Sequence, residues 1–589
     1  MAWTNEDVAG RFSEIATLLK LKGEDAFRVR AYERAAAAIG AASVDLATVS
    51  PDQLSELKGI GASTAKKITE YLETGTIGML EELRAGVPPG LVELVRIPGL
   101  GPKTAAILHA ELGVDSVESL RHAIEAGQLR GLKGLGAKTE ANLRDSIVRM
   151  GAKHDERVPA ADAIAIAGEL CTRLRALPGV DEVVYAGSLR RMRDTIGDVD
   201  LLAASSDPEP VMAALRDSDL VERVIAAGEK KTSVILRRGI QADLRVVDPV
   251  AWGAALVYFT GSKAHNIRIR ERAIRRRLSL NEYGLWRIGE DGRDGLLGER
   301  VASRTESDVY AALGMQFVPP PMREDTGEVE AAAQGTLPQV VTVADIRGDL
   351  HGHSDWSGDG KATLEEMVHA AAERGLAYWA VTDHAENLSI NGIDREGMRC
   401  RRRAIAELQE RVGLRILDGV ELNIGIDGSL DYDLEFLLEF DFCVASVHTL
   451  LNRPGEEQTA RILAAIEHPA VNVIGHPTGR KIGRRPGYDI DLDALVERAV
   501  FTGTALELNA SPRRFDLSAE HCRRAIEGGA LLTISCDAHS VGDLDNLGYG
   551  VATAQRGWVP PDRVLNCWDL DRLLDMVNAK RGSRMRKVR

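Results

Sequence analysis

Apolar and polar positions follow three patterns along the chain. Residues 1–150 carry Ala-rich amphipathic stretches of helical period, such as 25–39, separated by short Gly-containing turns. Residues 155–248 alternate helical patterns with β-rich runs, which predicts an α+β region, and a mixed segment continues to 318. Beyond 345, short apolar runs alternate with helical patterns, which predicts a parallel β/α barrel or an open α/β sheet. The seven runs are DLHGHS, YWAVTDH, RILDGVEL, FDFCVASVH, VNVIGHP, TALELNA and LLTISCDAH.

Length and composition indicate a multidomain protein of ordinary globular character. The chain has 589 residues, of which 44% are apolar and 4% aromatic, so we expect about three to five domains. It has no run of about 18 uncharged apolar residues, and its start lacks a basic segment followed by an apolar one. We therefore expect neither a membrane protein nor a secreted one. The six cysteines are scattered, which favours reduced thiols and a cytoplasmic location.

The formal net charge of −14 is unevenly distributed. Residues 1–318 carry a net charge of −2 and the rest carry −12, so the acidity belongs to the C-terminal part. The basic run RIRERAIRRR at 268–277 suits a phosphate-facing surface, although a solvated helix face explains the charges equally well. Prolines, charges and small residues at 319–344 predict a flexible linker between the two parts.

Three turns of the N-terminal region share a Gly-apolar-Gly pattern between two predicted helices. Glycines at the start of a helix let backbone N–H groups approach an anion closely, so such a turn holds a phosphate without reading bases. A single copy is equally explained as a helix C-cap, but three copies favour binding of the DNA backbone. The turns resemble the helix-hairpin-helix motif of DNA repair proteins. The candidate DNA-binding glycines are Gly59, Gly61, Gly99, Gly101, Gly134 and Gly136.

Three acidic residues of the α+β region suit a two-metal site. The two-residue period of a strand puts Asp198 and Asp200 on one face, with Val199 on the other. Asp243 lies in another predicted strand. Three carboxylates on adjacent strands can hold two Mg²⁺ ions, one activating a 3′-hydroxyl and one neutralising pyrophosphate. An Asp-x-Asp pair alone is more often a salt-bridged exposed strand, but the preceding GSLRR raises the specificity.

The combination of GSLRR with GDVDLL resembles the nucleotidyltransferase signature of the family X DNA polymerases. The segments RVP (157–159), YFTGSKAHN (258–266) and LSLNEYGLW (278–286) extend the resemblance into the palm and thumb of that family. The resemblance implies Mg²⁺ or Mn²⁺ on Asp198, Asp200 and Asp243. It also implies a nucleotide-binding site. The triphosphate would be contacted by Arg157, Gly187, Ser188, Arg191 and Gly197. The sugar would be contacted by Tyr258, Phe259 and Gly261, and the base by Asn266.

A lysine in the first hairpin aligns with the lyase nucleophile of the repair polymerases. Schiff-base chemistry at a baseless site needs such a lysine, and Lys67 occupies the position. The surrounding pocket departs from the family pattern because Arg28 stands where the family has lysine, although Tyr32 is kept. The alternative is that Lys67 and Lys66 only bind phosphate.

Nine of the thirteen histidines lie after residue 350, and most of them close the apolar runs of the predicted barrel. Imidazoles and carboxylates gathered at strand ends suit Zn²⁺, Mn²⁺ or Fe²⁺. The HxH, TDH, GVE, SxH, GHP and CDAH motifs resemble the polymerase and histidinol phosphatase (PHP) domain, which implies a distorted (β/α)7 barrel with three ions. The implied ligand groups are His351, His353, Glu421 and Asp537; Glu421, His448 and His476; and Asp359, His384 and His539.

Other residues near these motifs have supporting roles in this interpretation. Asp383 is expected to orient the metal ligands. The segment HSDWSGDG is one residue longer than the family spacing before Asp359. Arg480, Arg484 and Arg485 follow the GHP motif, and either contacts with DNA phosphates or a solvated loop explains them.

We interpret the sequence as a family X DNA polymerase fused to a PHP nuclease. It would fill short gaps in base excision repair and act as a 3′→5′ exonuclease, with endonuclease activity at abasic sites as a further option. Gapped or nicked DNA and deoxynucleoside triphosphates are the expected partners of a monomer. One alternative makes the PHP half a phosphatase or pyrophosphatase, and another makes the chain a non-catalytic scaffold that binds DNA structures. The expected domains are 1–85 (lyase-like), 86–153 (fingers), 154–248 (palm), 249–318 (thumb), 319–344 (linker) and 345–589 (PHP).

Overall fold

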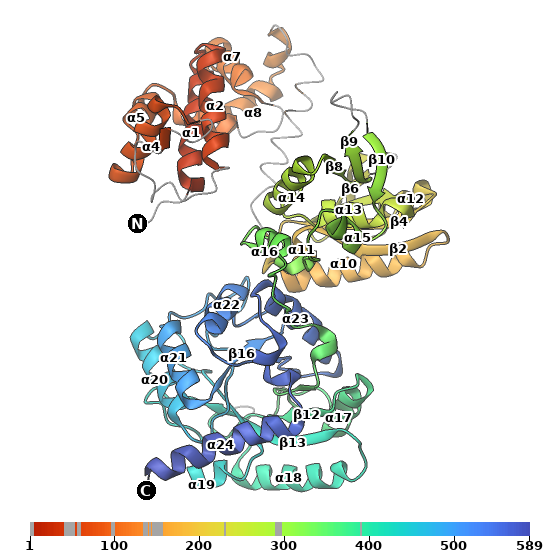
Figure 1. Cartoon of the computed structure of the whole chain (residues 1–589), viewed down its shortest axis with the longest axis vertical. Helices are drawn as coiled ribbons and strands as arrows, with labels where there is room; N and C mark the ends of the chain where they lie inside the picture. The colour runs from red at the N-terminus through yellow and green to blue at the C-terminus, as the bar shows by residue number, and fades with distance from the viewer. Residues whose placement is uncertain are drawn as a thin grey trace. The chain divides into compact units, whose positions relative to one another are not determined.

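The computed structural model divides into two compact units, residues 1–156 and 157–589 (Figure 1). It describes residues 5–588 apart from 41–53, 56–59, 96–99, 133–139, 141–142, 144–156, 229–230, 289–296 and 389–391. No helix of the described residues is both long and apolar enough to span a membrane.

The first unit is helical, as the sequence pattern predicts. Its apolar helix faces share one core that runs from Val8 to Leu143, so the expected 1–85 and 86–153 domains pack together. Gly61 and Gly101 are the N-cap residues of two of its helices. The elements are α1 (Asn5–Leu21), α2 (Ala26–Gly40), α4 (Ala62–Thr74), α5 (Gly78–Ala85), α6 (Pro89–Leu94), α7 (Pro102–Leu112), α8 (Val117–Glu125) and η2 (Gln128–Gly131).

The second unit begins with a mixed five-stranded sheet of order β2-β4-β7-β6-β5. In β4 the residues Val199 and Leu201 are buried while Asp198 is exposed, as period-2 alternation requires. The parallel strands β4 and β7 place Asp200 directly opposite Asp243. The elements are β1 (Val158–Pro159), α10 (Ala160–Arg175), β2 (Val180–Tyr185), α11 (Gly187–Arg190), β3 (Thr195–Ile196), β4 (Asp198–Ser205), α12 (Pro208–Arg216), β5 (Val221–Ala227), β6 (Lys231–Leu236) and β7 (Gln241–Val247).

A smaller region with an antiparallel sheet of order β10-β9-β8 follows, and the segment 319–344 is packed into it. In place of the flexible linker expected there, the chain forms α16, whose Val329 and Ala332 join the core, and it buries Arg323 completely. Apolar residues between the charges, together with ion pairs for the charges, explain the ordered structure. The elements are α13 (Trp252–Thr260), α14 (Lys263–Arg275), β8 (Leu278–Asn281), β9 (Gly284–Ile288), β10 (Leu297–Ala302), α15 (Glu306–Ala312) and α16 (Glu328–Gln334).

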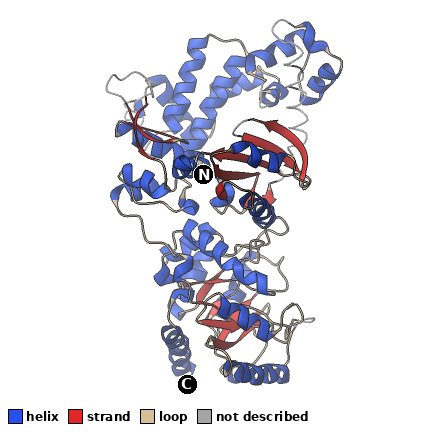
Figure 2. Ribbon diagram, turned by 90° about the vertical axis from the view of Figure 1, so that its right-hand side faces the viewer, coloured by secondary structure: helices blue, strands red, loops and turns tan. Residues whose placement is uncertain are grey.

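The C-terminal region is a parallel seven-stranded barrel of order β11-β12-β13-β14-β15-β16-β17. Figure 2 shows strands of this region in red among the surrounding helices in blue. A parallel bridge between Gly352 and Ala538 joins the first and last strands beyond their ends. All seven predicted runs form these strands, which confirms the barrel. The strands are β11 (Gly348–Asp349), β12 (Tyr378–Val381), β13 (Arg415–Asn423), β14 (Phe442–Ser446), β15 (Val473–Ile474), β16 (Ala505–Asn509) and β17 (Leu532–Ser535).

Helices surround the barrel and bury its outer face in one large apolar core. They are α17 (Leu364–Glu373), α18 (Arg395–Gln409), α19 (Leu434–Leu437), α20 (Gly455–Glu467), α21 (Leu492–Thr502), α22 (Ala519–Glu527), α23 (Leu547–Arg556) and α24 (Leu570–Val588). The barrel also contacts the mixed sheet region, because Phe515 is fully buried in a small core with Ala160 and Met192.

Candidate active sites

The acidic residues of β4 and β7 lie side by side as predicted. Lys231 of β6 forms an ion pair with Asp243, with 2.8 Å between Nζ and Oδ2. Gln241 Nε2 donates a hydrogen bond to the other carboxylate oxygen, Oδ1, at 2.9 Å. Lys231 therefore supplies the positive charge that offsets the acids in this structure. The sequence did not predict a lysine at this site. Lys231 reaches Asp243 because strands β6 and β7 pair with Lys231 opposite Arg245, and this pairing forms only in the folded sheet.

The neighbouring carboxylates affect the protonation of Asp200. Burial and the charges of Asp198 and Asp243 raise the pKa of Asp200 to about 7. Burial alone would also raise the pKa of Asp243, but hydrogen bonds from Lys231 and Gln241 hold it below its usual value. A divalent cation at this place would remove the repulsion that keeps a proton on Asp200.

The predicted nucleotide-binding residues lie in two groups, of which the first touches the acids. Gly187 has a φ of +58°, and a Cβ there would lie 2.1 Å from Asp200 Oδ2, so only glycine permits this approach. Ser188 follows it in α11. Arg157 donates from Nε to Thr195 Oγ1 at 2.9 Å, and its Nη1 lies beside Gly197.

In the second group, the end of α13 gathers the remaining candidates. Asn266 Nδ2 donates to the Tyr258 carbonyl oxygen at 2.7 Å, and Arg191 donates to the carbonyl of Thr260. The rings of Tyr258 and Phe259 meet edge to face with 5.0 Å between their centroids. Gly261 adopts a φ of +67° next to the Arg191 guanidinium.

The hairpin residues are only partly described by the structure. Gly61 and Gly101 open α4 and α7 in extended conformation. Lys67 donates from Nζ to Ser63 Oγ at 3.0 Å, and its Nζ lies 5.9 Å from the centre of the Tyr32 ring. The other predicted glycines, Gly59, Gly99, Gly134 and Gly136, lie outside the described residues.

The histidine-rich group forms one compact cluster at the C-terminal ends of the barrel strands. A single carboxylate, that of Glu421 on β13, lies within 3.5 Å of the nitrogens of five imidazoles. These belong to His351, His353, His384, His448 and His476. Parallel strands bring their C-terminal ends to one edge, so residues almost 200 positions apart meet there.

Two further carboxylates complete the cluster. Asp537 Oδ1 lies 3.2 Å from His353 Nε2 and 3.7 Å from His351 Nε2. Asp359 Oδ2 lies 3.2 Å from His384 Nε2 and 3.3 Å from His539 Nε2. The extra residue of the HSDWSGDG segment is accommodated in a turn that closes tightly at Gly360, where a Cβ would meet the Ser354 carbonyl oxygen at 1.9 Å.

The carboxylates of the cluster raise the pKa of two of its imidazoles. Burial alone would lower the pKa of His384, but Glu421 and Asp359 raise it to about 10. Burial alone would also lower the pKa of His539, but Asp359 and Asp537 raise it to about 9. By contrast, burial and the neighbouring imidazoles lower the pKa of His353 to about 4. The carboxylates therefore attract positive charge into a buried site.

The arrangement of donors fits divalent metal ions. Three groups bring ligand atoms within 4.8 Å of one another: His353, Asp359, His384 and His539; His351, His353 and Asp537; and His384, Glu421 and His448. His351 Nε2, His353 Nε2 and Glu421 Oε1 are buried without a well-aligned hydrogen bond among the described residues. Such orphaned nitrogen and oxygen donors are costly unless a ligand satisfies them, and imidazole with carboxylate suits Zn²⁺, Mn²⁺ or Fe²⁺.

Several residues that sequence reasoning missed fix the orientation of these donors. Glu507 of β16 accepts from His351 Nδ1 at 2.7 Å, which leaves Nε2 directed at the cluster. Asn423 Oδ1 plays the same part for His448 Nδ1 at 2.7 Å, and Asn509 Nδ2 donates to Asp537 Oδ2 at 3.0 Å. The available sequence signal was the pair of polar residues, Glu507 and Asn509, inside the predicted apolar run TALELNA.

Asp383 lies outside the cluster, as expected, and connects it to the barrel wall. It accepts a hydrogen bond from the Ser354 backbone N–H, and Ser357 Oγ, with one proton to donate, lies 3.1 Å from both Asp383 Oδ1 and Asp359 Oδ1. The fully buried Arg401 of α18 donates to Asp383. Asp383 therefore holds the loop that carries Asp359.

Four segments of the chain match known protein families. Residues 255–324 match the DNA polymerase beta thumb family, and residues 349–508 match the PHP domain family. Residues 3–77 match a helix-hairpin-helix domain, and residues 91–148 match a SAM-like helix-hairpin-helix tandem. The thumb match ends inside the segment expected to be a linker.

Curated relatives cover either nearly the whole chain or about two fifths of it. DNA polymerase/3′-5′ exonuclease PolX of Bacillus subtilis (strain 168) is 39% identical over 569 residues, which cover 96% of this chain and 98% of that protein. A probable phosphatase of Edwardsiella ictaluri is 30% identical over 243 residues, covering 39% of this chain and 94% of that protein. A probable phosphatase of Syntrophotalea carbinolica is 30% identical over 228 residues, covering 37% and 90%.

Proposed function

Since the chain belongs to the PolX family of DNA polymerase/3′-5′ exonucleases, we propose how its two activities divide between the two clusters. The protein is a family X DNA polymerase joined to a PHP exonuclease domain. We assign primer extension to the acids of β4 and β7, in the palm, and removal of 3′ nucleotides to the histidine-rich cluster of the barrel. The barrel assignment depends on one observation, the Glu421 carboxylate surrounded by five imidazoles.

In the palm, Asp198, Asp200 and Asp243 hold Mg²⁺ or Mn²⁺. Bound there, the cations would lower the pKa of the primer 3′-hydroxyl and offset the charge of the departing pyrophosphate. Bound cations would favour the ionised form of Asp200, and the Lys231 ion pair favours the ionised form of Asp243.

The nucleotide sits between the palm acids and the end of α13. Arg157, Gly187, Ser188, Arg191 and Gly197 face its triphosphate, and Tyr258, Phe259 and Gly261 line its sugar. Asn266 faces the base. The support for this placement is that Gly187 touches Asp200 while Arg191 touches both Thr260 and the Gly261 turn.

In the barrel, the nine donors hold Zn²⁺, Mn²⁺ or Fe²⁺ in up to three places. The ions would supply hydroxide at neutral pH and take up charge on the phosphate. Glu507 and Asn423 keep the imidazoles of His351 and His448 in the tautomer whose Nε2 faces the cluster.

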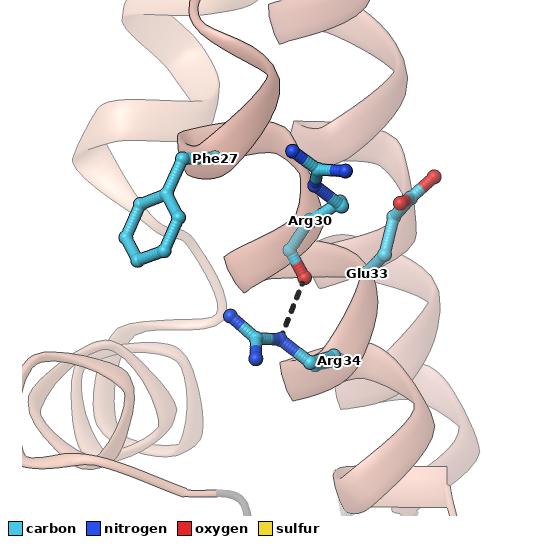
Figure 3. Close-up of a pocket in the computed structure, with 4 residues that line it drawn as sticks. All are labelled: Phe27, Arg30, Glu33 and Arg34. Atoms are coloured by element: carbon cyan, nitrogen blue, oxygen red, sulfur yellow. Dashed lines mark hydrogen bonds between the residues drawn. The ribbon is translucent and has the colours of Figure 1, made fainter.

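The helical unit binds gapped or nicked DNA through its hairpins, and the whole chain acts as a monomer in base excision repair. The exposed face of α2 offers a further contact: Phe27 is 69% exposed beside Arg30 and Arg34 (Figure 3), a combination suited to a base and phosphates. Arg34 Nε donates to the Arg30 carbonyl oxygen at 3.3 Å.

One experiment tests the division of activities. The substrate is 5′-labelled gapped DNA with Mg²⁺ or Mn²⁺, with and without nucleotides. Asp198→Ala is expected to lose extension only, and His384→Ala to lose degradation only. If each substitution abolished both reactions, the division into two sites would be wrong.

Lyase activity at Lys67 and cleavage at abasic sites are separate proposals. Trapping with borohydride on a baseless substrate would leave a covalent adduct on the native chain and none on Lys67→Ala. The phosphatase alternative predicts free phosphate from histidinol phosphate or pyrophosphate in place of nucleotide release from a 3′ end. The similarity over nearly the whole chain to a polymerase/exonuclease does not favour it, and the complete donor sets do not favour a non-catalytic scaffold.

A further inference from the structure

Two loops at the mouth of the barrel carry basic residues next to the histidine-rich cluster. One follows β15 and contains Lys481, and the other follows β16 and contains Arg514; we call these two residues the basic pair. The loops are joined because Ile482 N–H donates to the Arg513 carbonyl oxygen at 2.8 Å. The pair therefore sits on a common support beside the predicted metal ligands.

Arg514 lies against the cluster without being bound tightly to it. Its Nε is 3.7 Å from Asp537 Oδ2, an oxygen that already accepts the hydrogen bond from Asn509. Burial and the charge of Arg514 lower the pKa of His476 to about 3, so Arg514 is close to two of the proposed ligands. Its guanidinium donates no hydrogen bond to another described residue. Its N–H donors are available to a ligand.

The side chain of Lys481 lies near other positively charged side chains. The charge of Arg514, then burial and Arg485, lower the pKa of the Lys481 ammonium. Asp537 acts in the opposite direction and does not overcome them. Cations placed together with so little neutralisation are stabilised when an anion binds between them.

This concentration of cations is local, because the C-terminal part of the chain carries a net charge of −12. An acidic barrel repels a DNA strand except where basic residues face it. Arg480, which follows the GHP motif, does not serve here, since its Nη1 donates to Asp194 of the palm at 2.8 Å. Arg485 donates to the Gly479 carbonyl oxygen.

The barrel and the palm together hold the basic pair in place. Phe515, next to Arg514, is fully buried against Met192 and Ala160 of the palm. Asp516 accepts hydrogen bonds from the Thr478 side chain and backbone, which connects the two loops a second time. The two loops are therefore positioned before any substrate arrives.

We propose that Arg514 and Lys481 bind phosphate groups of the DNA strand whose 3′ end enters the histidine-rich cluster. This inference rests on the exonuclease assignment above and adds the residues that retain the strand. Arg514 presents a planar fork of donors and Lys481 a mobile ammonium, and both suit phosphate oxygens. A small phosphate ester offers the same chemistry, so the test compares the two substrates.

The test measures steady-state degradation of a 5′-labelled single strand by full-length Arg514→Ala and Lys481→Ala with Mn²⁺. We expect KM to rise about tenfold or more in each variant, since a charge-assisted hydrogen bond is lost. The slope of log KM against log salt should fall by about 1 per residue. Lys481→Arg should retain most of the native KM. The matched control is Arg403→Ala, an exposed arginine on α18, which should change neither quantity.

The outcomes separate this inference from the assignment beneath it. If the native protein degraded no DNA while His384→Ala behaved identically, the exonuclease assignment would fail. If the native protein degraded DNA and both variants kept its KM and salt slope, only the basic pair would be refuted. Loss of bound metal in the variants, measured by elemental analysis, would also refute it, because the residues would then support the ligands. If KM of the variants also rose for the p-nitrophenyl ester of thymidine 5′-phosphate, the basic pair would contact the reacting phosphate. If KM rose for DNA alone, the pair would contact a neighbouring phosphate of the strand.

Discussion

Asp194 of the palm accepts a hydrogen bond from Arg480 of the barrel, with 2.8 Å between Oδ2 and Nη1. The second carboxylate oxygen of Asp194 lies 3.6 Å from Arg556 of α23, which also donates to the Met192 carbonyl oxygen at 3.0 Å. Both arginines are less than a fifth exposed. The palm and the barrel are therefore joined by a partly buried charge network beside a small apolar core.

Removing this carboxylate should weaken the junction. Asp194→Ala leaves two partly buried guanidiniums short of an acceptor, which costs roughly 1–3 kcal/mol. We expect calorimetry to show a lower Tm for the palm and barrel, or their separation into two transitions. Asp219→Ala is the matched control because the exposed Asp219 pairs with Arg173 at the surface, and it should change the Tm little. Equal effects of the two substitutions would contradict the role of the junction.

Gly187→Ala should impair extension through the position of Asp200. The added Cβ would lie 2.1 Å from Asp200 Oδ2, and it would also be strained at a φ of +58°. We expect single-nucleotide insertion to fall at least tenfold while degradation of a 3′ end continues, as measured on one labelled primer. Gly239→Ala separates strain from contact, because Gly239 has a φ of +82° and open space around its Cβ position. Similar losses of insertion in both variants would argue against the contact with Asp200.

Glu421→Gln should reduce the number of metal ions bound to the histidine-rich cluster. The substitution keeps the volume of the side chain and removes the charge that faces five imidazoles, so the affinity for divalent ions falls. We expect fewer bound ions by elemental analysis, no degradation, and no increase of Tm on adding Mn²⁺, since a ligand stabilises only the state that binds it. Glu365→Gln on the exposed face of α17 should preserve all three properties. A native ion content in Glu421→Gln would exclude Glu421 as the shared ligand.

The sequence predicts the barrel and the donor cluster well because both depend on local signals. Each barrel strand is a short apolar run, and most of the donors lie at or shortly after the end of such a run, so topology brings them together. The strand β5 gives no alternating signal, because most of its residues are exposed, the apolar Val224 included. Lys231 and Arg514 act through pairings across sheets and loops, and no periodicity shows such contacts. The ordered structure of 319–344 was not predicted for the same reason, because the ion pair between Arg323 and Glu306 joins two segments that meet only in the folded chain.

Glu306 should make the folded state sensitive to acid. Burial alone would raise its pKa, but the guanidiniums of Arg323 and Arg190 lower it to about 2. Its unfolded value is about 4.5, so the folded state favours the ionised carboxyl. The resulting stability, on the order of 3 kcal/mol, is present above about pH 4.5 and is lost as the pH falls toward 2.

Urea unfolding of the native chain and Glu306→Gln between pH 7 and pH 3 measures this contribution. We expect the variant to be less stable at pH 7 and the difference to shrink below pH 4.5, because the native carboxyl then takes up the proton that the amide imitates. Glu299→Gln, at an exposed position of β10, should follow the native curve throughout. A difference that stayed constant with pH would show that shape, and not the charge of Glu306, stabilises the contact between the palm, the thumb and the segment 319–344.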